Sequence, residues 1–355
     1  MALWVDKYRP TQLSELSYHK DQALRIADMV KNDDFPHLLI YGPNGAGRKT
    51  RINCVLRELF GAPSERLRLE TKNFTAPSGK KLDIQTVSSN YHIELSPGDV
   101  GVYDRVVVQE VVKQMAQSSN LDISQRSFKV VVLMEVDKLT RDAQHALRRT
   151  MEKYSGNCRL ILCCESLSRV IEPLQSRCVA IRVAAPSNDE VRDAVFDVCQ
   201  KENVKMPEAV LKDLIEKAQG NVRRAILMAE TAKVQAPNGV IQSNQKIPLP
   251  EWELYIKETA EMLIKQQNNE TLMKVRERLS EVLSRCIPPN VLFVHLLKCL
   301  LPVCSPSARS QVIAEAARYE HRLTRGQKAI FHLEAFVAAF MVIYAEANTN
   351  EAMEH

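Results

Sequence analysis

The pattern of apolar positions divides the 355-residue chain into an α/β part and a helical part. Up to residue 183, short apolar runs alternate with stretches whose apolar residues recur every three or four positions, which is typical of buried strands alternating with amphipathic helices. This order predicts a parallel sheet covered on both faces by helices. Strands are expected at residues 37–40, 91–95, 129–137, 159–164 and 178–183, and helices at residues 20–31, from 51 onward, 104–116 and 140–154. The polar residues 64–90 predict a hairpin or an irregular insertion, and a polar loop is expected from 117 to 126.

Beyond Ala184 only helical periodicity is present. Ser187 followed by Glu190 predicts a capping box at the start of a helix, and three short helices up to Val234 would form a lid-sized domain. Residues 237–250 contain several prolines and predict a linker. Five helices follow, and the last is apolar nearly all round, so it is expected to be buried within its own domain or between subunits. The predicted domains are an α/β nucleotide-binding domain at 1–185, a helical lid at 186–236 and an all-α collar at 250–348.

Composition narrows the class of protein only slightly. Apolar residues make up 45% and charged residues 26%, as in ordinary soluble proteins, and a net charge of +5 requires any nucleic-acid site to be a local basic cluster. The longest apolar run near the C-terminus has eleven residues, 335–345, and the first residues lack a signal peptide, so no membrane contact is expected. Nine cysteines without a C-x-x-C pair indicate reduced thiols in an intracellular protein and no metal site.

A glycine-rich stretch between the first strand and its helix carries the clearest chemical signal. It matches the phosphate-binding pattern G-x-x-x-x-G-K-[ST] at Gly42 and Gly47. Its backbone N–H groups and the helix dipole would bind an anion. The stretch therefore predicts nucleotide binding by Gly42, Pro43, Asn44, Gly45, Ala46, Gly47, Arg48, Lys49 and Thr50.

The departures from this pattern concern hydrolysis. Arg48 replaces the lysine and still neutralises phosphate, but its planar fork is not equivalent to a point charge. Lys49 replaces the hydroxyl that binds Mg²⁺, and Thr50 is turned about 100° away along the helix. In the acidic motif after the third strand, Met134 occupies the metal-binding Asp position while Glu135 remains. Mg²⁺ requires oxygen ligands, so we expect it to bind weakly or not at all.

The N-terminal segment 4–10 mixes aromatic and basic residues. It is either an arm packed on the core or part of the nucleotide site. In the second case Tyr8, Arg9 and Pro10 would flank the base of a nucleotide whose phosphates lie at the glycine-rich loop.

Four segments, in this order along the chain, resemble the small subunits of replication factor C, the eukaryotic sliding-clamp loader of the AAA+ ATPase class. They are residues 4–10, 42–50, 146–152 and 176–178. The resemblance implies a hetero-pentamer of replication factor C subunits. Such a complex uses ATP to open the sliding clamp, proliferating cell nuclear antigen, and to place it on primer–template DNA in the nucleus during replication and repair.

The resemblance also implies roles for individual residues. Arg177 matches the arginine finger that a subunit supplies to its neighbour's ATP site, and Arg223 matches the lid arginine that senses the phosphates of its own site. Glu165 stands where the family has an Asn that orients the attacking water. Glu135 would then be retained but idle, with ATP or ADP bound and not hydrolysed.

Three hypotheses remain open at this point. The chain is a loader subunit with a degenerate site of its own, a working ATPase subunit of the same type of complex, or a scaffold that needs no nucleotide. For DNA we expect contacts from the start of two helices, through Arg105, Arg141 and Lys113, unless these are solvated surface charges. Arg148 and Arg149, in mid-helix, are expected to serve subunit packing or coupling.

Overall fold

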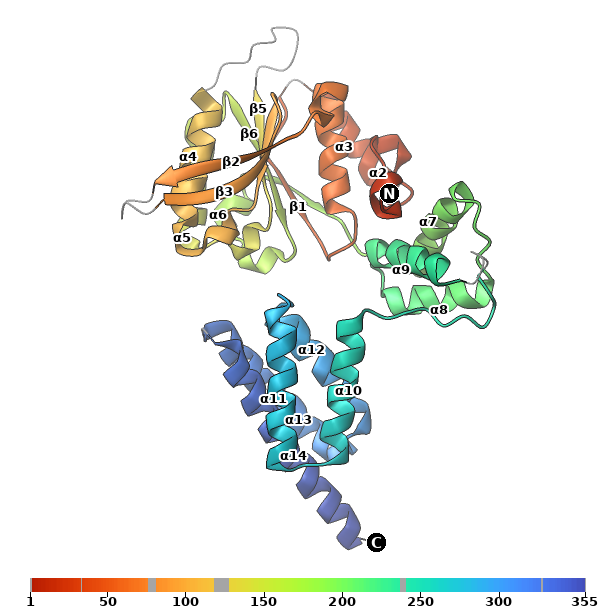
Figure 1. Ribbon diagram of the computed structural model, residues 1–355. Helices are drawn as coiled ribbons and strands as arrows, with labels where there is room; N and C mark the ends of the chain where they lie inside the picture. Colours follow the sequence, from red (N-terminus) through yellow and green to blue (C-terminus); the bar gives the residue numbers. More distant parts are fainter. Residues whose placement is uncertain are drawn as a thin grey trace. The chain divides into compact units, whose positions relative to one another are not determined.

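The computed structural model describes residues 2–32, 34–75, 81–117, 128–236, 241–326 and 328–354 (Figure 1). Contacts divide the chain into two units, Met1–Ile247 and Pro248–His355. The first contains a β-sheet with its helices and a group of three further helices. The second contains helices only in the part that the structure describes.

The described residues of the first unit form a seven-stranded sheet with the order β2-β3-β4-β5-β6-β1-β7. The last five strands of this order run parallel, whereas β2 and β3 pair antiparallel with each other and β3 pairs antiparallel with β4. The strands are β1 Leu38–Tyr41, β2 Arg68–Thr75, β3 Lys81–Ser88, β4 His92–Leu95, β5 Lys129–Leu133, β6 Cys158–Cys164 and β7 Val179–Arg182.

Both faces of this sheet are buried, which is why its central strands are continuous apolar runs. Side chains alternate along a strand, so Val131 and Leu133 of β5 pack with α4 and α5, while Val130 and Val132 pack with α2 and α3. Figure 1 shows the two pairs of helices on opposite sides of the sheet. The helices of this part are α1 Trp4–Lys7, α2 Lys20–Lys31, α3 Arg48–Phe60, α4 Asp104–Gln117, α5 Arg141–Tyr154 and α6 Glu172–Gln175.

Two expectations about the sheet need correction. The hairpin expected within 64–90 is present as β2 and β3, but it also extends the main sheet through β4, which its polar sequence did not indicate. The strand expected over 129–137 ends at Leu133, because Glu135 adopts a left-handed conformation (φ 53°) and residues Val136–Lys138 form a 3₁₀ turn. The loop predicted at 117–126 lies outside the described residues from 118 onward.

Three helices make up the lid, and they are α7 Asn188–Lys201, α8 Glu208–Ala218 and α9 Val222–Gln235. The capping box predicted at Ser187 is confirmed, since Ser187 Oγ accepts a hydrogen bond from Glu190 N–H and Glu190 Oε2 accepts one from Ser187 N–H. The N-terminal arm packs on this lid, where the Trp4 side chain is buried and the Trp4 backbone N–H donates to Glu230 Oε2 of α9. The arm therefore contacts the lid.

The second unit has an apolar core of its own formed by five helices. The helices are α10 Glu251–Lys265, α11 Asn269–Ser284, α12 Pro289–Leu300, α13 Pro306–Arg325 and α14 Ala329–Glu354. By length and composition alone, residues 329–347 of α14 are apolar enough to cross a membrane. One face of α14 packs in the core through Phe336, Val337 and Phe340, while Phe331 on another face is 52% exposed. Burial of α14 within its own domain is therefore incomplete in this chain, and burial of the remaining face between subunits stays a prediction.

Candidate functional site

The sheet topology brings three sequence motifs to one edge. Strands β5, β6 and β1 are adjacent and parallel, so their carboxyl ends lie side by side. The glycine-rich loop follows β1, Glu165 follows β6, and Glu135 follows β5. In open parallel sheets, ligands bind beyond the carboxyl ends of the strands, and this edge is therefore the candidate site.

The backbone of the loop has the conformation that its glycines predict. Gly42, Gly45 and Gly47 have φ values of 151°, 76° and 83°, and Gly47 lies directly before α3. A Cβ atom on Gly42 would lie 1.9 Å from the Val183 carbonyl oxygen. A Cβ atom on Gly45 would lie 1.8 Å from Asn221 Oδ1 at the start of α9, so lid and loop approach each other closely. Only glycine fits at these two positions.

Two buried residues that the sequence did not single out support the loop from below. The Tyr18 hydroxyl donates to the Ala46 carbonyl oxygen at 2.9 Å, and burial raises the pKa of this hydroxyl, so it stays a neutral donor. Arg51, fully buried in the first turn of α3, donates to the Tyr18 carbonyl oxygen at 3.0 Å and lies over the Tyr18 ring. An arginine among apolar helix positions was the available signal for this support.

The loop side chains are bonded among themselves. Arg48 Nη2 donates to Asn44 Oδ1 at 2.6 Å, and Asn44 Nδ2 donates to Glu165 Oε2 at 3.2 Å. The Glu165 carboxylate thus contacts the loop directly. On the other side, Asp137 Oδ2 accepts the backbone N–H of Glu165 at 3.2 Å, which connects the ends of β5 and β6.

The position that binds Mg²⁺ in phosphate-binding loops contains a cation here. Lys49 Nζ forms an ion pair with Glu94 Oε1 of β4 at 2.5 Å, with the Glu94 side chain 14% exposed. Glu135 is paired with Lys138 at 2.7 Å, and the neighbouring Met134 is partly buried in the apolar core. An ammonium group and a thioether offer Mg²⁺ no oxygen, so these residues do not fit the metal. Among the described residues, no group of three or more His, Cys, Asp or Glu side chains is arranged to hold a metal ion.

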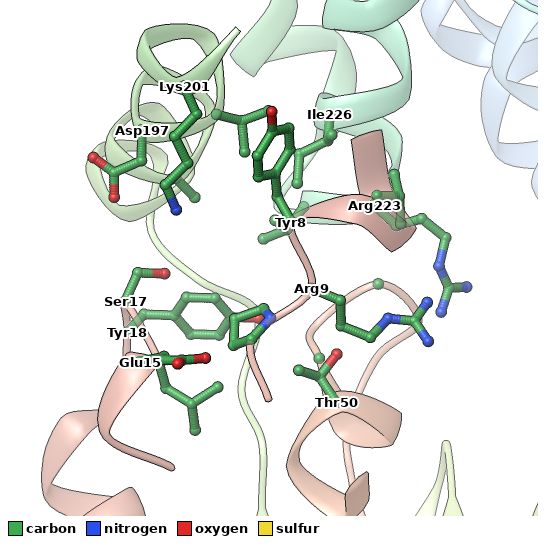
Figure 2. Close-up of a pocket in the computed structure, with 18 residues that line it drawn as sticks. Tyr8, Arg9, Glu15, Ser17, Tyr18, Thr50, Asp197, Lys201, Arg223 and Ile226 are labelled. Atoms are coloured by element: carbon green, nitrogen blue, oxygen red, sulfur yellow. The ribbon is translucent and has the colours of Figure 1, made fainter. Parts of the chain in front are cut away.

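A pocket lies between the loop, the N-terminal arm and the lid (Figure 2). Figure 2 shows Arg9, Arg223 and Thr50 on one side of this pocket, and Tyr18, Asp197 and Lys201 on the other. Its lining includes seven residues that the sequence assigned to the nucleotide, namely Tyr8, Arg9, Pro10, Gly45, Gly47, Thr50 and Arg223. Of the other six, Asn44, Arg48 and Lys49 have the contacts just described, Gly42 adjoins Val183, Ala46 accepts from Tyr18, and Pro43 is exposed.

The arm is fixed to the lid at the mouth of this pocket. Glu202 accepts hydrogen bonds from Lys7 at 2.7 Å and from the Tyr8 hydroxyl at 2.6 Å. The bond from Lys7 has the larger effect and that from Tyr8 the smaller, and together they lower the pKa of Glu202 to about 2. The carboxylate is therefore ionised at neutral pH. The lid residues Asp197, Lys201 and Ile226 also line the pocket, and nothing in the sequence indicated this role.

Arg177 lies apart from these contacts, just beyond α6. Its Nε donates to Glu152 Oε1 at 2.8 Å, its Nη1 donates to the Pro173 carbonyl oxygen at 2.8 Å, and its side chain remains 35% exposed. Glu152 is the last residue of the family-like segment 146–152. The structure therefore joins two of the segments that carried the resemblance into one contact.

The residues expected to bind DNA lie on α4 and α5. Buried Asp104 accepts the Thr140 N–H at 2.7 Å and the Thr140 hydroxyl at 2.9 Å, which ties together the starts of the two helices. Arg105 and Arg141 are exposed beside this junction, and Lys113 is exposed farther along α4. A surface hollow is lined by Arg105, Gln109, Asp142, His145, Ala146, Arg148 and Arg149. Arg148 and Arg149, which we expected to serve subunit packing or coupling, line this hollow together with Arg105.

Comparisons with known proteins agree with this architecture. The family model "Replication factor C subunit 3, C-terminal domain" matches residues 252–348, "RCF1/5-like, AAA+ ATPase lid domain" matches 196–234, and "DNA polymerase III, delta subunit" matches 18–187. Among solved structures, Thermotoga maritima RuvB, a Holliday junction branch migration motor, aligns with a TM-score of 0.50 at 14% identity. That alignment covers 77% of this chain and 85% of RuvB, and it shows the fold alone.

Curated relatives match nearly the whole chain. Replication factor C subunit 3 of mouse and of human are each 53% identical over 345 residues, covering 97% of this chain and 96% of the relative. Subunit 5 of Schizosaccharomyces pombe is 44% identical and covers 97% of both chains. The Arg-Lys-Thr form of the loop and the Glu-Val-Asp form of the acidic motif also predict likeness to the third subunit. The chain therefore belongs to the replication factor C small-subunit family of AAA+ proteins, in the group that includes subunit 3 of mouse and human.

Proposed function

We propose that this chain is a small subunit of a nuclear clamp-loader complex. The complex is a hetero-pentamer of replication factor C subunits that uses ATP to open the sliding clamp, proliferating cell nuclear antigen. It then places the clamp on primer–template DNA in replication and repair. Within it, this chain binds ATP or ADP at its own loop without useful hydrolysis and supplies Arg177 to the ATP site of a neighbouring subunit.

The contrast between the loop and Arg177 carries this proposal. At the loop, Lys49 in the metal-ligand position is paired with Glu94 of β4, and Glu165, which follows β6, accepts a hydrogen bond from Asn44. Arg177 has one acidic partner and is partly exposed. A guanidinium at a subunit junction stabilises the charge that develops during phosphoryl transfer, and it works without a functional loop in its own chain.

The three-domain division is part of the same proposal. Residues 1–185 would bind nucleotide, 186–236 would close over it as the lid, and 250–348 would join the subunits as a collar. The lid is suited to this role because Asn221 and Arg223 at the start of α9 adjoin the glycine-rich loop and its pocket.

DNA is assigned to the joined starts of α4 and α5. Arg105 and Arg141 are exposed there, and helix N-termini with basic side chains are suited to backbone phosphates. Lys113 would extend the contact along α4. Such contacts should appear as a lower salt dependence of DNA binding when Arg105 is replaced by Glu.

The test is ATP hydrolysis by the reconstituted complex, stimulated by DNA and clamp, with one substitution at a time in this chain. Arg177→Ala should lower hydrolysis at one junction by about a thousandfold, which removes that site's share of the total turnover. Glu135→Gln should leave the total unchanged, because the glutamate faces a site that does not hydrolyse.

The controls separate the alternatives. Arg169→Ala removes a nearby arginine outside the Ser176–Cys178 segment and should have no effect. A decrease with Glu135→Gln would mean that this chain is a working ATPase. An unchanged rate with Arg177→Ala would remove the proposed action on a neighbour.

A further inference from the structure

We propose that this chain binds nucleotide without a divalent metal, with the Lys49 ammonium group taking the place of Mg²⁺ beside the phosphates. The inference rests on the nucleotide site of the proposed function and adds to it how the charge of the phosphates is balanced. It predicts a site that keeps its nucleotide when magnesium is removed, unlike a hydrolysing site.

The position of Lys49 is the first support. In the pattern G-x-x-x-x-G-K-[ST], the residue after the basic one holds the metal, and that residue is Lys49, in the first turn of α3. Its ammonium group therefore starts from the backbone position that would otherwise place a metal-bound hydroxyl beside the phosphates.

The contact with Glu94 is the second support. Glu94 lies on β4, next to β5, the strand that leads to Met134, and its side chain is 14% exposed. This carboxylate holds Lys49 Nζ at 2.5 Å, while 42% of the Lys49 side chain remains exposed. An ammonium group has three donors, so Lys49 is able to keep Glu94 and still donate to a phosphate oxygen.

The third support is that a metal ligand is missing from both the glycine-rich loop and the acidic motif after β5. Lys49 replaces the hydroxyl and Met134 replaces the carboxylate, so neither of the two metal-ligand positions supplies an oxygen. A cation in this position would also repel Mg²⁺. Arg48, Arg9 and Arg223 lie in or around the same site and add positive charge for phosphates that no metal neutralises.

The experiment measures ADP binding to the full-length chain by calorimetry, in excess magnesium and in excess EDTA. We expect the two dissociation constants to agree within about twofold. Lys49→Met should weaken binding about tenfold or more in both buffers, because one charge-assisted hydrogen bond is lost. Lys138→Met is the matched control, since it removes an ammonium group paired with a carboxylate near the same sheet edge and should leave binding unchanged.

A second variant restores the missing metal ligands and tests whether ADP binding then becomes dependent on magnesium. Lys49→Thr combined with Met134→Asp supplies a hydroxyl and a carboxylate, so EDTA should now weaken ADP binding by about tenfold. Circular dichroism checks that each variant is folded. The comparison of ADP binding in magnesium and in EDTA uses the unchanged chain and does not depend on any variant. A tenfold loss in EDTA for the unchanged chain would overturn the inference alone. Absence of ADP binding in both buffers would overturn it together with the proposed nucleotide site.

Discussion

The glycine-rich loop and the Arg177 corner, which consists of Arg177 with its partners Glu152 and Pro173, are two basic sites of the same unit. Their charged groups are held in different ways. In the loop, Arg48 is bonded to Asn44 and Lys49 to Glu94. At the corner, Arg177 is bonded to Glu152 and to a backbone carbonyl, and its side chain is partly exposed. Under the proposed function, a neighbouring subunit would engage Arg177 by displacing Glu152 and the Pro173 carbonyl, whereas hydrolysis at the loop would require several replaced side chains.

This difference distinguishes phosphate binding, which depends on the loop backbone, from hydrolysis, which depends on side chains. The loop keeps the three glycines with positive φ that let backbone N–H groups surround an anion. Hydrolysis depends instead on side chains that position a metal and a water molecule, and these are the residues that differ here. Binding is therefore expected to persist where hydrolysis is lost. Substitutions in and around the loop test whether binding and hydrolysis are separate in this way.

The largest effect is expected from Gly42→Ala. The new Cβ atom would lie 1.9 Å from the Val183 backbone oxygen, and no flexible side chain is there to move aside. We expect the free energy of unfolding of this unit to fall by about 3 kcal/mol or more, with loss of ADP binding. Urea denaturation and calorimetry measure the two effects.

Two other glycines serve as controls for this substitution. Gly101 has φ 62° and ψ −121°, a conformation that L-residues rarely adopt, but open space around its Cβ position, so Gly101→Ala tests backbone strain alone and should cost about 1–3 kcal/mol. Gly156 has open space and is not in the left-handed region, so Gly156→Ala should be close to neutral. If Gly42→Ala were no worse than Gly101→Ala, the close approach to Val183 would not matter.

A smaller effect, in the opposite direction, is expected from Glu165→Asn. The exposed carboxylate reaches Asn44 of the loop, where it would repel the terminal phosphate of ATP. Removing its charge should tighten ATP binding by about three- to tenfold, a gain of about 1 kcal/mol for a solvent-screened pair. Competition between ATP and labelled ADP measures the change.

Glu165→Gln is the control, because it removes the charge and keeps the length of the side chain. Both variants should favour ATP more than ADP, since ADP lacks the terminal phosphate. An equal gain for both nucleotides would mean that Glu165 acts through the loop conformation and not through its charge.

The sequence predicted the sheet, the lid and the loop because each depends on local patterns. Apolar runs mark β1 and β4 to β7, and Ser187 with Glu190 marks the start of α7. The end of β5 was missed because Val136 is apolar and buried although it lies in a 3₁₀ turn. Periodicity reports burial, and burial alone does not distinguish a strand from a buried turn.

The pairings within the site were not predictable in the same way. Lys49 and Glu94 are far apart in the sequence and meet only because β4 and the start of α3 lie at one edge of the sheet. Glu152 and Arg177 meet for a similar reason. Motifs indicated which residues matter, whereas the partner of each was set by tertiary packing.

The smallest expected effect concerns the support beneath the loop. Tyr18→Phe keeps the buried ring against Arg51 and removes the hydroxyl that donates to the Ala46 carbonyl oxygen. Loss of this hydrogen bond should cost about 1 kcal/mol, seen as a decrease of about 2–4 °C in the melting temperature. Tyr154→Phe, at a half-buried tyrosine of α5, is the control and should change little. Because the lost bond holds the loop and not the Arg177 corner, ADP affinity should weaken while the complex retains its full ATP hydrolysis. A lower hydrolysis rate at unchanged ADP affinity would show that the two sites are coupled.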